Sequence, residues 1–283
     1  DSATLSTNAR ESNFGLGTNL SYKHELNVFA VDLDFRFNKY QFGESDTTLL
    51  AYRKKELNHI LHFRPTISSY RFDDKLKIEL GLDLNFDFSA TSIFKPLFVA
   101  NLKYSLLDGM FIPYLGIDGN LTQNTFHSLN RGNPYINSSI DLKNTKEMKI
   151  YGGIKGTLSK TISFDVHANH TTLNDMALYI NDTIFSDQYK FNVVYDDKIT
   201  KLSFGGSMTY QDNEKLKIDA MADYNIYTTR DQDYAWYLPQ LEISLRGSYN
   251  IYDKIYAKVD FTIKGGRKSP NGILNPDPTN DKQ

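Results

Sequence analysis

The dominant pattern along this chain is a strict alternation of apolar and polar side chains. Between residues 76 and 88 every even position is apolar, and every odd position is polar or glycine. Successive side chains of a strand point to opposite faces of a sheet, whereas a helix would spread these charges around its circumference. The segment is therefore predicted to be a strand with one apolar face and one polar face.

The same alternation recurs along most of the chain, and no comparable helical run accompanies it. The clearest further examples are residues 14–23, 29–38, 216–226, 240–246 and 255–263. Many runs reach about ten residues, whereas strands of soluble proteins average about five or six. About ten residues, tilted near 40°, cross an apolar band roughly 25 Å tall. The pattern predicts an all-β fold, an antiparallel transmembrane β-barrel with about twelve strands in this chain, as part of a larger barrel.

Each predicted strand assigns its residues to one of two surfaces. The residues predicted to face lipid are Leu76, Ile78, Leu80, Leu82, Leu84, Phe86, Leu216, Ile218, Leu241, Ile243, Leu245, Val259 and Phe261. The charged residues predicted to face the lumen are Asp32, Asp34, Arg36, Lys77, Glu79, Asp83, Asp87, Lys217, Asp219, Asp223, Glu242 and Arg246. Rings of lumenal charge can select which solutes pass. The simpler interpretation is that balancing charges and water fill a polar lumen.

Aromatic side chains gather near the ends of the predicted strands. Examples are Tyr40, Phe42, Tyr70, Phe72, Tyr104, Phe111, Tyr224, Tyr227, Trp236, Tyr237, Tyr249, Tyr252 and Tyr256. Amphipathic rings favour the interface between membrane and water, so these residues are predicted to form girdles. Half-buried sheets of soluble proteins also alternate, which leaves a soluble all-β domain as an alternative. That alternative predicts a protein that stays monodisperse without detergent.

The connections alternate in length, as do the short periplasmic turns and longer extracellular loops of outer-membrane barrels. Tight turns are predicted at 24–25, 73–74, 108–109, 159–160, 212–213 and 253–254. Longer links are predicted at 43–56, 89–95, 123–146, after His170 and at 228–235. The alternation holds if residues 187–210 form one strand with a bulge at 196–200, because a bulge shifts the apolar phase by one residue.

The predicted topology places both termini on the side of the long loops. Residues 266–283 are polar and are predicted to be an extracellular loop or tail. Complete barrels normally keep both termini in the periplasm. We therefore expect residues 1–283 to be a single barrel domain that lacks strands at both ends.

Composition removes several classes of chemistry. The chain has 32 basic and 34 acidic residues and no cysteine, so it lacks the charge of a nucleic-acid binder and any thiolate site. His59 and His62, like His167 and His170, are three residues apart, which places the partners of each pair on opposite faces of a strand. No Gly-x-Ser-x-Gly motif occurs. We expect no enzyme activity, no metal and no cofactor.

Three segments resemble a known family. Residues 111–129 (FIPYLGIDGNLTQNTFHSL), 131–136 (RGNPYI) and 150–156 (IYGGIKG) resemble uncharacterised outer-membrane barrels of Bacteroidetes that are similar to TonB-dependent receptors. The resemblance extends through 191–197 to the strands near Trp236. It implies an outer-membrane location and a link to nutrient uptake. It covers the barrel part only, because the chain has no room for a plug domain and no recognised segment that would contact TonB.

These observations predict an integral protein of the cell outer membrane, embedded in the lipid bilayer. The first hypothesis is a TonB-dependent-receptor-like transporter or pore for small solutes. The alternative is a non-conducting barrel that acts as an anchor or subunit of a larger assembly with other envelope proteins. Nucleic acid is not an expected partner.

Overall fold

The computed structural model describes residues 9–44, 52–182, 190–213, 215–251 and 254–270. Twelve strands form one antiparallel sheet, and two more form a separate hairpin. The wall strands are β1 (Ala9–His24), β2 (Asn27–Glu44), β3 (Tyr52–Arg71), β4 (Leu76–Asp87), β5 (Phe94–Tyr104), β6 (Ile112–Thr122), β7 (Thr145–Thr157), β8 (Ile162–Asn174), β11 (Ile199–Asp212), β12 (Leu216–Thr228), β13 (Leu241–Ile251) and β14 (Ile255–Gly265). The hairpin consists of β9 (Met176–Asn181) and β10 (Phe191–Asp196). The predicted all-β fold and strand number are confirmed.

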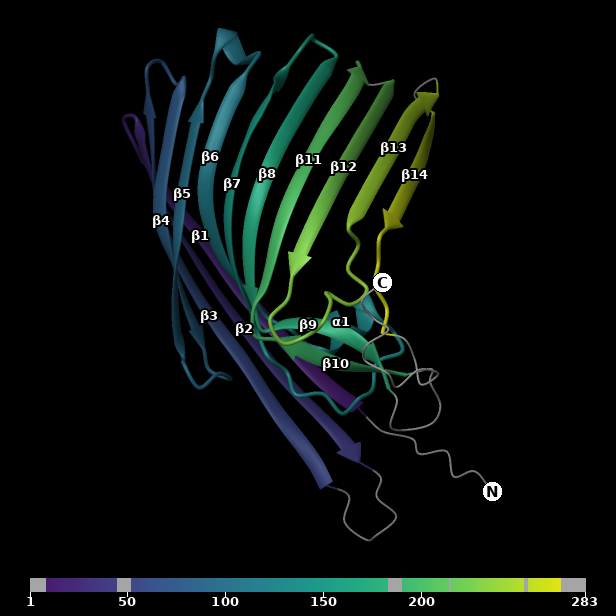
Figure 1. Ribbon diagram of the computed structural model, residues 1–283. Helices are drawn as coiled ribbons and strands as arrows, with labels where there is room; N and C mark the ends of the chain where they lie inside the picture. Colours follow the sequence, from purple (N-terminus) through teal and green to yellow (C-terminus); the bar gives the residue numbers. More distant parts are fainter. Residues whose placement is uncertain (1–8, 45–51, 183–189, 214, 252–253, 271–283) are drawn as a thin grey trace.

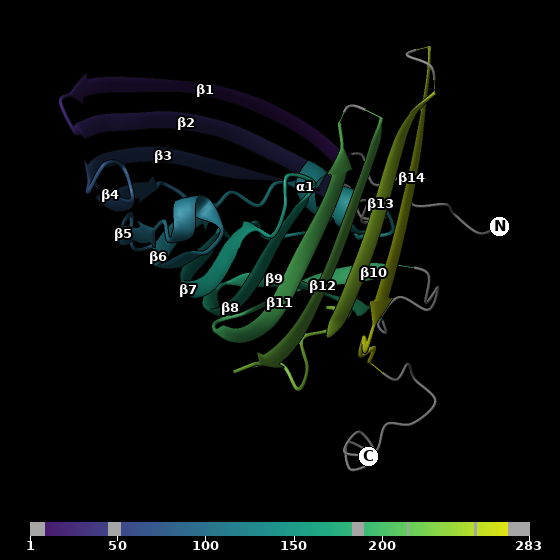
Figure 2. The ribbon, with the colours of Figure 1, turned by 90° about the horizontal axis from the view of Figure 1, so that it is seen from above.

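The twelve wall strands form a curved arc whose two ends are β1 and β14 (Figures 1 and 2). Neighbours in the sheet are neighbours in the sequence, except that β8 pairs with β11. The concave side of the arc holds β9, β10 and the short helix α1 (Phe126–Gly132). We call the concave side the inner face and the opposite side the outer face. No helix in the described residues is both long and apolar enough to cross a membrane.

The burial of the two faces is the reverse of that in a soluble sheet. Every wall strand is at least 11 residues long, and most of the apolar residues in the long alternating runs lie on the outer face. On β4, the outer-face side chain of Leu80 is 54% exposed, whereas the inner-face residues Asp83 and Asp87 are 2% and 0% exposed. The outer face of this wall therefore lacks the covering layer that a soluble protein needs.

The tight turns lie together at one end of the sheet, as predicted (Figure 1). A two-residue turn joins β1 to β2, where Glu25 has a φ of 51°. Asp73 and Asp74 between β3 and β4 also have positive φ angles, a conformation that short Asp side chains tolerate. The longer connections lie at the opposite end. Residue 253 of the last predicted turn lies outside the described residues.

The prediction of one bulged strand over 187–210 is wrong. β10 ends at Asp196 and pairs with β9, whereas β11 begins at Ile199 and pairs with β8 and β12. The carboxylate of Asp196 accepts a hydrogen bond from the backbone N–H of Lys198 at 2.9 Å, which closes a turn between the two strands. The shift in apolar phase therefore marks a change of sheet. Tight turns and long connections still alternate along the wall, because β9 and β10 both lie outside the wall sheet.

The β9–β10 hairpin lies between two apolar clusters on the inner face, because both of its faces are apolar. The first cluster contains Tyr40, Phe42, Leu129, Ile136, Ile140 and Leu142, with Phe126, Ala177, Tyr179, Phe191 and Val193 packed against it. The second contains Leu178, Ile199 and Trp236, with Leu173, Met176, Ile180, Val194, Tyr227, Tyr234, Tyr237 and Leu238 packed against it. The apolar core therefore occupies the inner space at the end of the long connections.

These clusters correct part of the predicted aromatic girdle. Tyr40, Phe42 and Trp236 are buried on the inner side, where they hold the hairpin and its neighbouring loops. Tyr104 and Tyr249 do lie exposed on the outer face near strand ends. Inner and outer aromatic residues cannot be separated by proximity to a strand end alone, because both occur at the rims.

Helix α1 was not predicted, since its seven residues are too short to show a helical period. The Thr125 hydroxyl accepts the backbone N–H of Ser128 in a capping box. The carboxylate of Glu11, on β1, accepts the backbone N–H groups of Phe126 and His127, both at 2.8 Å. A negative charge at this helix terminus fixes α1 to the inner side of β1.

We expect Asp196→Asn to loosen the hairpin. The Asp196 carboxylate is fully buried and also accepts backbone N–H groups of Arg230, Asp231 and Gln232. Burial alone would raise its pKa, but these donors outweigh burial and hold the pKa below its usual range. Hydrogen bonds to a charged group are worth about 1.5–3 kcal/mol. Amide exchange in β9, β10 and residues 229–233 should therefore accelerate about tenfold or more.

Acidification supplies a second readout of the same site. A depressed folded-state pKa contributes stability above the unfolded value of about 4, and this contribution is lost as pH falls through the folded value. The protection of the hairpin amides against hydrogen exchange should fall over that pH range in the wild type. It should fall much less in Asp196→Asn. The neighbouring, exposed Asp197→Asn is the control. Equal effects of the two substitutions would contradict this role of Asp196.

Candidate functional site

The inner face is the candidate functional surface, because the structure gathers most polar side chains of the wall there. The predicted lumenal charges do not converge on a single centre. Most of them form local pairs with partners on the same or a neighbouring strand. These pairs are Asp34–Arg36 at 2.7 Å, Lys77–Glu79 at 2.6 Å, Asp87–Lys95 at 2.8 Å, Lys217–Asp219 at 3.3 Å, Glu242–Lys264 at 3.6 Å and Arg246–Asp260 at 3.5 Å.

The remaining predicted charges have polar neighbours as well. Asp32 accepts a hydrogen bond from the side-chain amide of Asn19. Asp83 lies 3.9 Å from the Nδ1 atom of His62, and Asp223 lies 3.1 Å from the Nε2 atom of His167. The inner face thus neutralises much of its own charge, as the simpler interpretation of a polar lumen requires.

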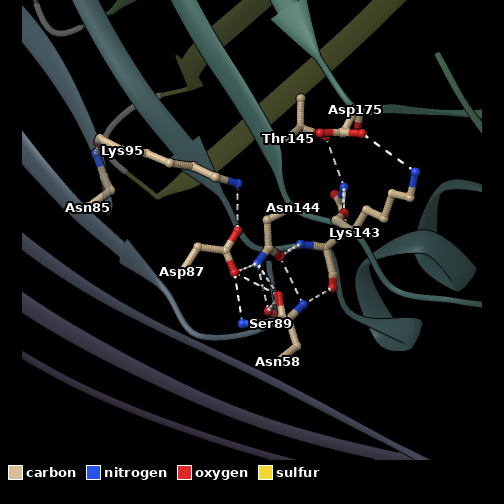
Figure 3. A network of polar contacts seen from close by, with 10 residues as sticks. Asn58, Asn85, Asp87, Ser89, Lys95, Lys143, Asn144, Thr145 and Asp175 are labelled. Carbon is tan, nitrogen blue, oxygen red and sulfur yellow. Dashed lines mark hydrogen bonds and ion pairs between the residues drawn. The ribbon is translucent and has the colours of Figure 1, made fainter. Parts of the chain in front are cut away.

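A buried polar network lies on the inner side at the end of the long connections (Figure 3). The side-chain amide of Asn144 donates to Asn58 at 2.7 Å and to Asp87 at 2.9 Å. Asp87 also accepts from the hydroxyl of Ser89 at 2.6 Å and pairs with Lys95. Because Asn144 ends the connection between β6 and β7, the network ties that connection to β3 and β4.

The network continues toward the hairpin. Asn124 donates to the hydroxyl of Thr145 at 2.9 Å, and that hydroxyl donates to the backbone carbonyl of Asp175 at 2.9 Å. The ammonium of Lys143 lies 3.7 Å from the Asp175 carboxylate. Asp175 immediately precedes β9. The loop between β6 and β7 and the β9–β10 hairpin are therefore held as one unit inside the arc.

The half of the inner face nearer the tight turns carries a second polar cluster. The imidazole of His167, on β8, contacts Asp165 through Nδ1 at 2.8 Å and Asp223 of β12 through Nε2 at 3.1 Å. The hydroxyl of Tyr114, on β6, donates to Asp165 at 2.9 Å. Gly205 lies between them on β11, where a Cβ would come within 1.9 Å of the Asp223 carboxylate. The cluster thus spans β6 to β12.

Two tyrosine rings cross glycines on the neighbouring strand. Tyr151 lies over Gly116 and accepts a hydrogen bond from Asn101 at 2.6 Å, whereas a Cβ on Gly116 would lie 2.5 Å from its hydroxyl oxygen. Tyr114 lies over Gly153 in the same way. Both glycines belong to the segments that carry the family resemblance. The motif therefore has a structural cause: an aromatic ring covers backbone that a glycine leaves exposed.

The histidine pairs occupy opposite faces, as their spacing predicts. His59 lies on the outer face, stacked on Phe37 with ring centroids 4.4 Å apart, whereas His62 lies on the inner face. His167 is likewise on the inner face. Within the described residues, no group of three or more His, Asp or Glu side chains could hold a metal ion. Around His167 the two carboxylates flank opposite ring nitrogens, so their oxygens do not converge.

The predicted lipid-facing residues share the outer face by strand register. Leu80 pairs with Ile67 of β3 and Ala100 of β5, and Leu245 pairs with Ala220 of β12 and Phe261 of β14. Among them, Leu80, Leu82, Leu241, Leu245, Val259 and Phe261 are exposed. The other predicted residues, Leu76, Ile78, Leu84, Phe86, Leu216, Ile218 and Ile243, are partly exposed. None of them belongs to the two apolar clusters of the inner side.

Several inner-face residues were missed by the sequence analysis. The alternation places Asp165 and His167 on one face of their strand, so their proximity could have been proposed. The pairing of Tyr114 with Asp165 and of Asn144 with Asn58 could not, because each depends on which strands are neighbours. The tyrosine and glycine positions of 111–119 and 150–156 are the one further signal that the sequence offered.

The fold is similar to that of solved receptors. The siderophore receptor PirA from Acinetobacter baumannii matches with a TM-score of 0.58 at 14% identity, over 92% of this chain and 43% of that one. The FrpB iron transporter from Neisseria meningitidis matches with a TM-score of 0.58 at 10% identity, over 87% and 41%. The ferripyoverdine receptor of the outer membrane of Pseudomonas aeruginosa matches with a TM-score of 0.56 at 11% identity, over 90% and 42%.

These similarities define the class of fold as that of outer-membrane receptor barrels, which agrees with the predicted location. This chain spans less than half the length of each of those three receptors. No protein-family model and no curated protein matches the sequence. The fold thus agrees with the expected resemblance to a receptor barrel, whereas the TonB-dependent family and an origin in Bacteroidetes stay predictions.

We expect Gly153→Val to disrupt the wall between β6 and β8. A Cβ there would lie 2.4 Å from the carbonyl oxygen of Val166 and 2.7 Å from the Tyr114 hydroxyl. Overpacking of this kind costs about 1–3 kcal/mol. The control is Gly15→Val, because a Cβ on Gly15 meets nothing within 4 Å. The free energy of unfolding in urea should fall for the first variant only, and equal values would contradict the packing of Tyr114 over Gly153.

Proposed function

We propose that this chain forms part of the wall of an outer-membrane barrel with a transporter-like role for small solutes. The observation that carries the proposal is the reversed burial of the wall, with Leu80 54% exposed on the outer face and Asp87 fully buried on the inner face. Hydrocarbon is the environment in which such an outer face is stable. The similarity to siderophore and iron receptors supports the transporter class.

A second candidate function is a non-conducting anchor or subunit of a larger envelope assembly. The observation that favours it is the filling of the inner space by the β9–β10 hairpin and the connection between β6 and β7. A transporter with this interior requires a passage beside the hairpin or a movement of it.

Planar-bilayer recordings on the full-length protein separate the two candidates. Steady, ion-selective openings would support the transporter. A silent protein that co-purifies with other envelope proteins would support the anchor. Monodisperse behaviour without detergent would contradict both, because the outer face would then have another partner.

Membrane insertion tests the outer face directly. We expect Leu245→Arg to impair folding into lipid vesicles, because an arginine facing lipid near the midplane costs about 2–4 kcal/mol. The matched control is Ser244→Arg, which changes the adjacent inner-face residue of the same strand. The folded fraction is measured by protease resistance in vesicles. Equal losses for both variants would contradict the assignment of the outer face to lipid.

A further inference from the structure

Three lysines of the inner face lie close together near the tight turns. Lys77 of β4 is directly opposite Lys103 of β5, and Lys103 is directly opposite Tyr114 of β6. The ammonium of Lys155, on β7, lies 5.9 Å from the centre of the Tyr114 ring. The strand register therefore places all three lysines on the same face and within one sector of the wall, from β4 to β7.

Like charges directly opposite each other on neighbouring strands are destabilising. Two carboxylates offset part of the cluster: Glu79 pairs with Lys77 at 2.6 Å and also accepts from Ser68 at 3.1 Å, and Asp165 of β8 is directly opposite Lys155. Lys103 makes no ion pair within the part of the chain that the structure describes. Three lysines against Glu79 and Asp165 leave one net positive charge on this sector.

The neighbouring aromatic and acidic groups do not neutralise that surplus. The ammonium of Lys77 lies 5.9 Å from the centre of the Tyr70 ring, a cation–π arrangement that leaves its charge in place. Asp165, which is already counted against Lys155, also accepts a hydrogen bond from the Tyr114 hydroxyl and contacts His167. The unpaired charge of this sector therefore faces the space inside the arc.

Apart from Glu79 on β4, the acidic side chains of the same level lie along the arc, beyond β7. Asp165, Asp219 and Asp223 are on β8 and β12, and each already accepts a hydrogen bond or pairs with a cation. At this level the inner wall carries its lysines on β4, β5 and β7 and most of its carboxylates on β8 and β12, whereas Asp83, Asp87 and Asp118 lie nearer the long connections. Such a separation attracts anions to one side of the interior and repels them from the other.

We propose that Lys77, Lys103 and Lys155 form a binding site for oxyanion groups, the carboxylates or phosphates of a multiply charged solute. The proposal deepens the proposed function, because it rests on the inner face lining a lumen. The anion would meet the unpaired ammonium of Lys103 between the two others. Lysine contacts such groups as a point charge with three rotatable donors, which suits solutes of varied shape.

Binding in detergent tests the site without requiring conduction. Pyranine, a fluorescent trisulfonate, is titrated with the full-length protein and followed by anisotropy, and inorganic phosphate or citrate is then added as a competitor. We expect Lys103→Gln to weaken pyranine binding about fivefold, the value of roughly one close charge–charge contact in water. Lys103→Arg should retain most of the affinity, because the charge is kept.

The matched control is Lys258→Gln. Lys258 lies on β14, and its alternation with the outer-face residue Val259 places it on the inner face, far along the arc from β5. The proposal predicts little change for this variant. Equal weakening by both glutamine variants, or no weakening by Lys103→Gln, would overturn the site. Failure of phosphate and citrate to displace the probe would also overturn it, since oxyanions would not be the ligand.

The outcome is separable from that of the bilayer recordings. If the protein binds pyranine through Lys103 but shows no conductance, the anion site is supported and the transporter role is contradicted. If the protein conducts ions but its affinity for pyranine does not depend on Lys103, the transporter role is supported and the anion site is contradicted. If an acidic protein segment co-purifies and blocks binding of the probe, the proposal of a solute ligand is overturned, because the site would then bind a protein.

Discussion

The structure depends on the hydrogen-bonded ladder between long antiparallel strands, because the ladder satisfies the backbone while exposing an apolar face. In hydrocarbon an unpaired backbone N–H or C=O group costs several kcal/mol, so a spanning wall must pair its strands along their length. Here each of the twelve wall strands pairs with its neighbours in register, and apolar rows such as Ile67, Leu80 and Ala100 run across them. Every other feature of the inner face is positioned by that register.

The inner side follows a different rule from the outer side. Its polar groups are satisfied by one another, as in the network around Asp87 and Asn144, and its apolar groups form closed clusters around the β9–β10 hairpin. The hairpin can enter this space because it is apolar on both faces, and Asp196 secures its end through backbone N–H groups. At the end of the long connections the interior is therefore a second folded layer, whereas nearer the tight turns the sector from β4 to β7 holds Lys103 without an ion pair among the described residues.

Three glycines of the wall provide space for polar and aromatic side chains on the inner face. Gly116, Gly153 and Gly205 provide room on the inner face for Tyr151, Tyr114 and the Asp223 carboxylate. The segments with recognisable family character are thus those in which a ring must cross a neighbouring strand. Their resemblance reflects packing of the wall and carries no information about a ligand.

The alternation of residues such as Leu80 and Asp83 determined the strands, their two faces and the tight turns, because side-chain direction in a strand depends only on local backbone geometry. The length of the strands determined the class of fold. The sequence could not determine where 191–196 pairs, since an apolar six-residue segment fits a wall strand or an internal hairpin equally well. Only the tertiary structure decided that Tyr40 and Trp236 are buried inside, that Asn144 reaches Asn58, and that Lys77, Lys103 and Lys155 share one sector. Those contacts join residues far apart in the chain, and strand order, register and curvature set them together.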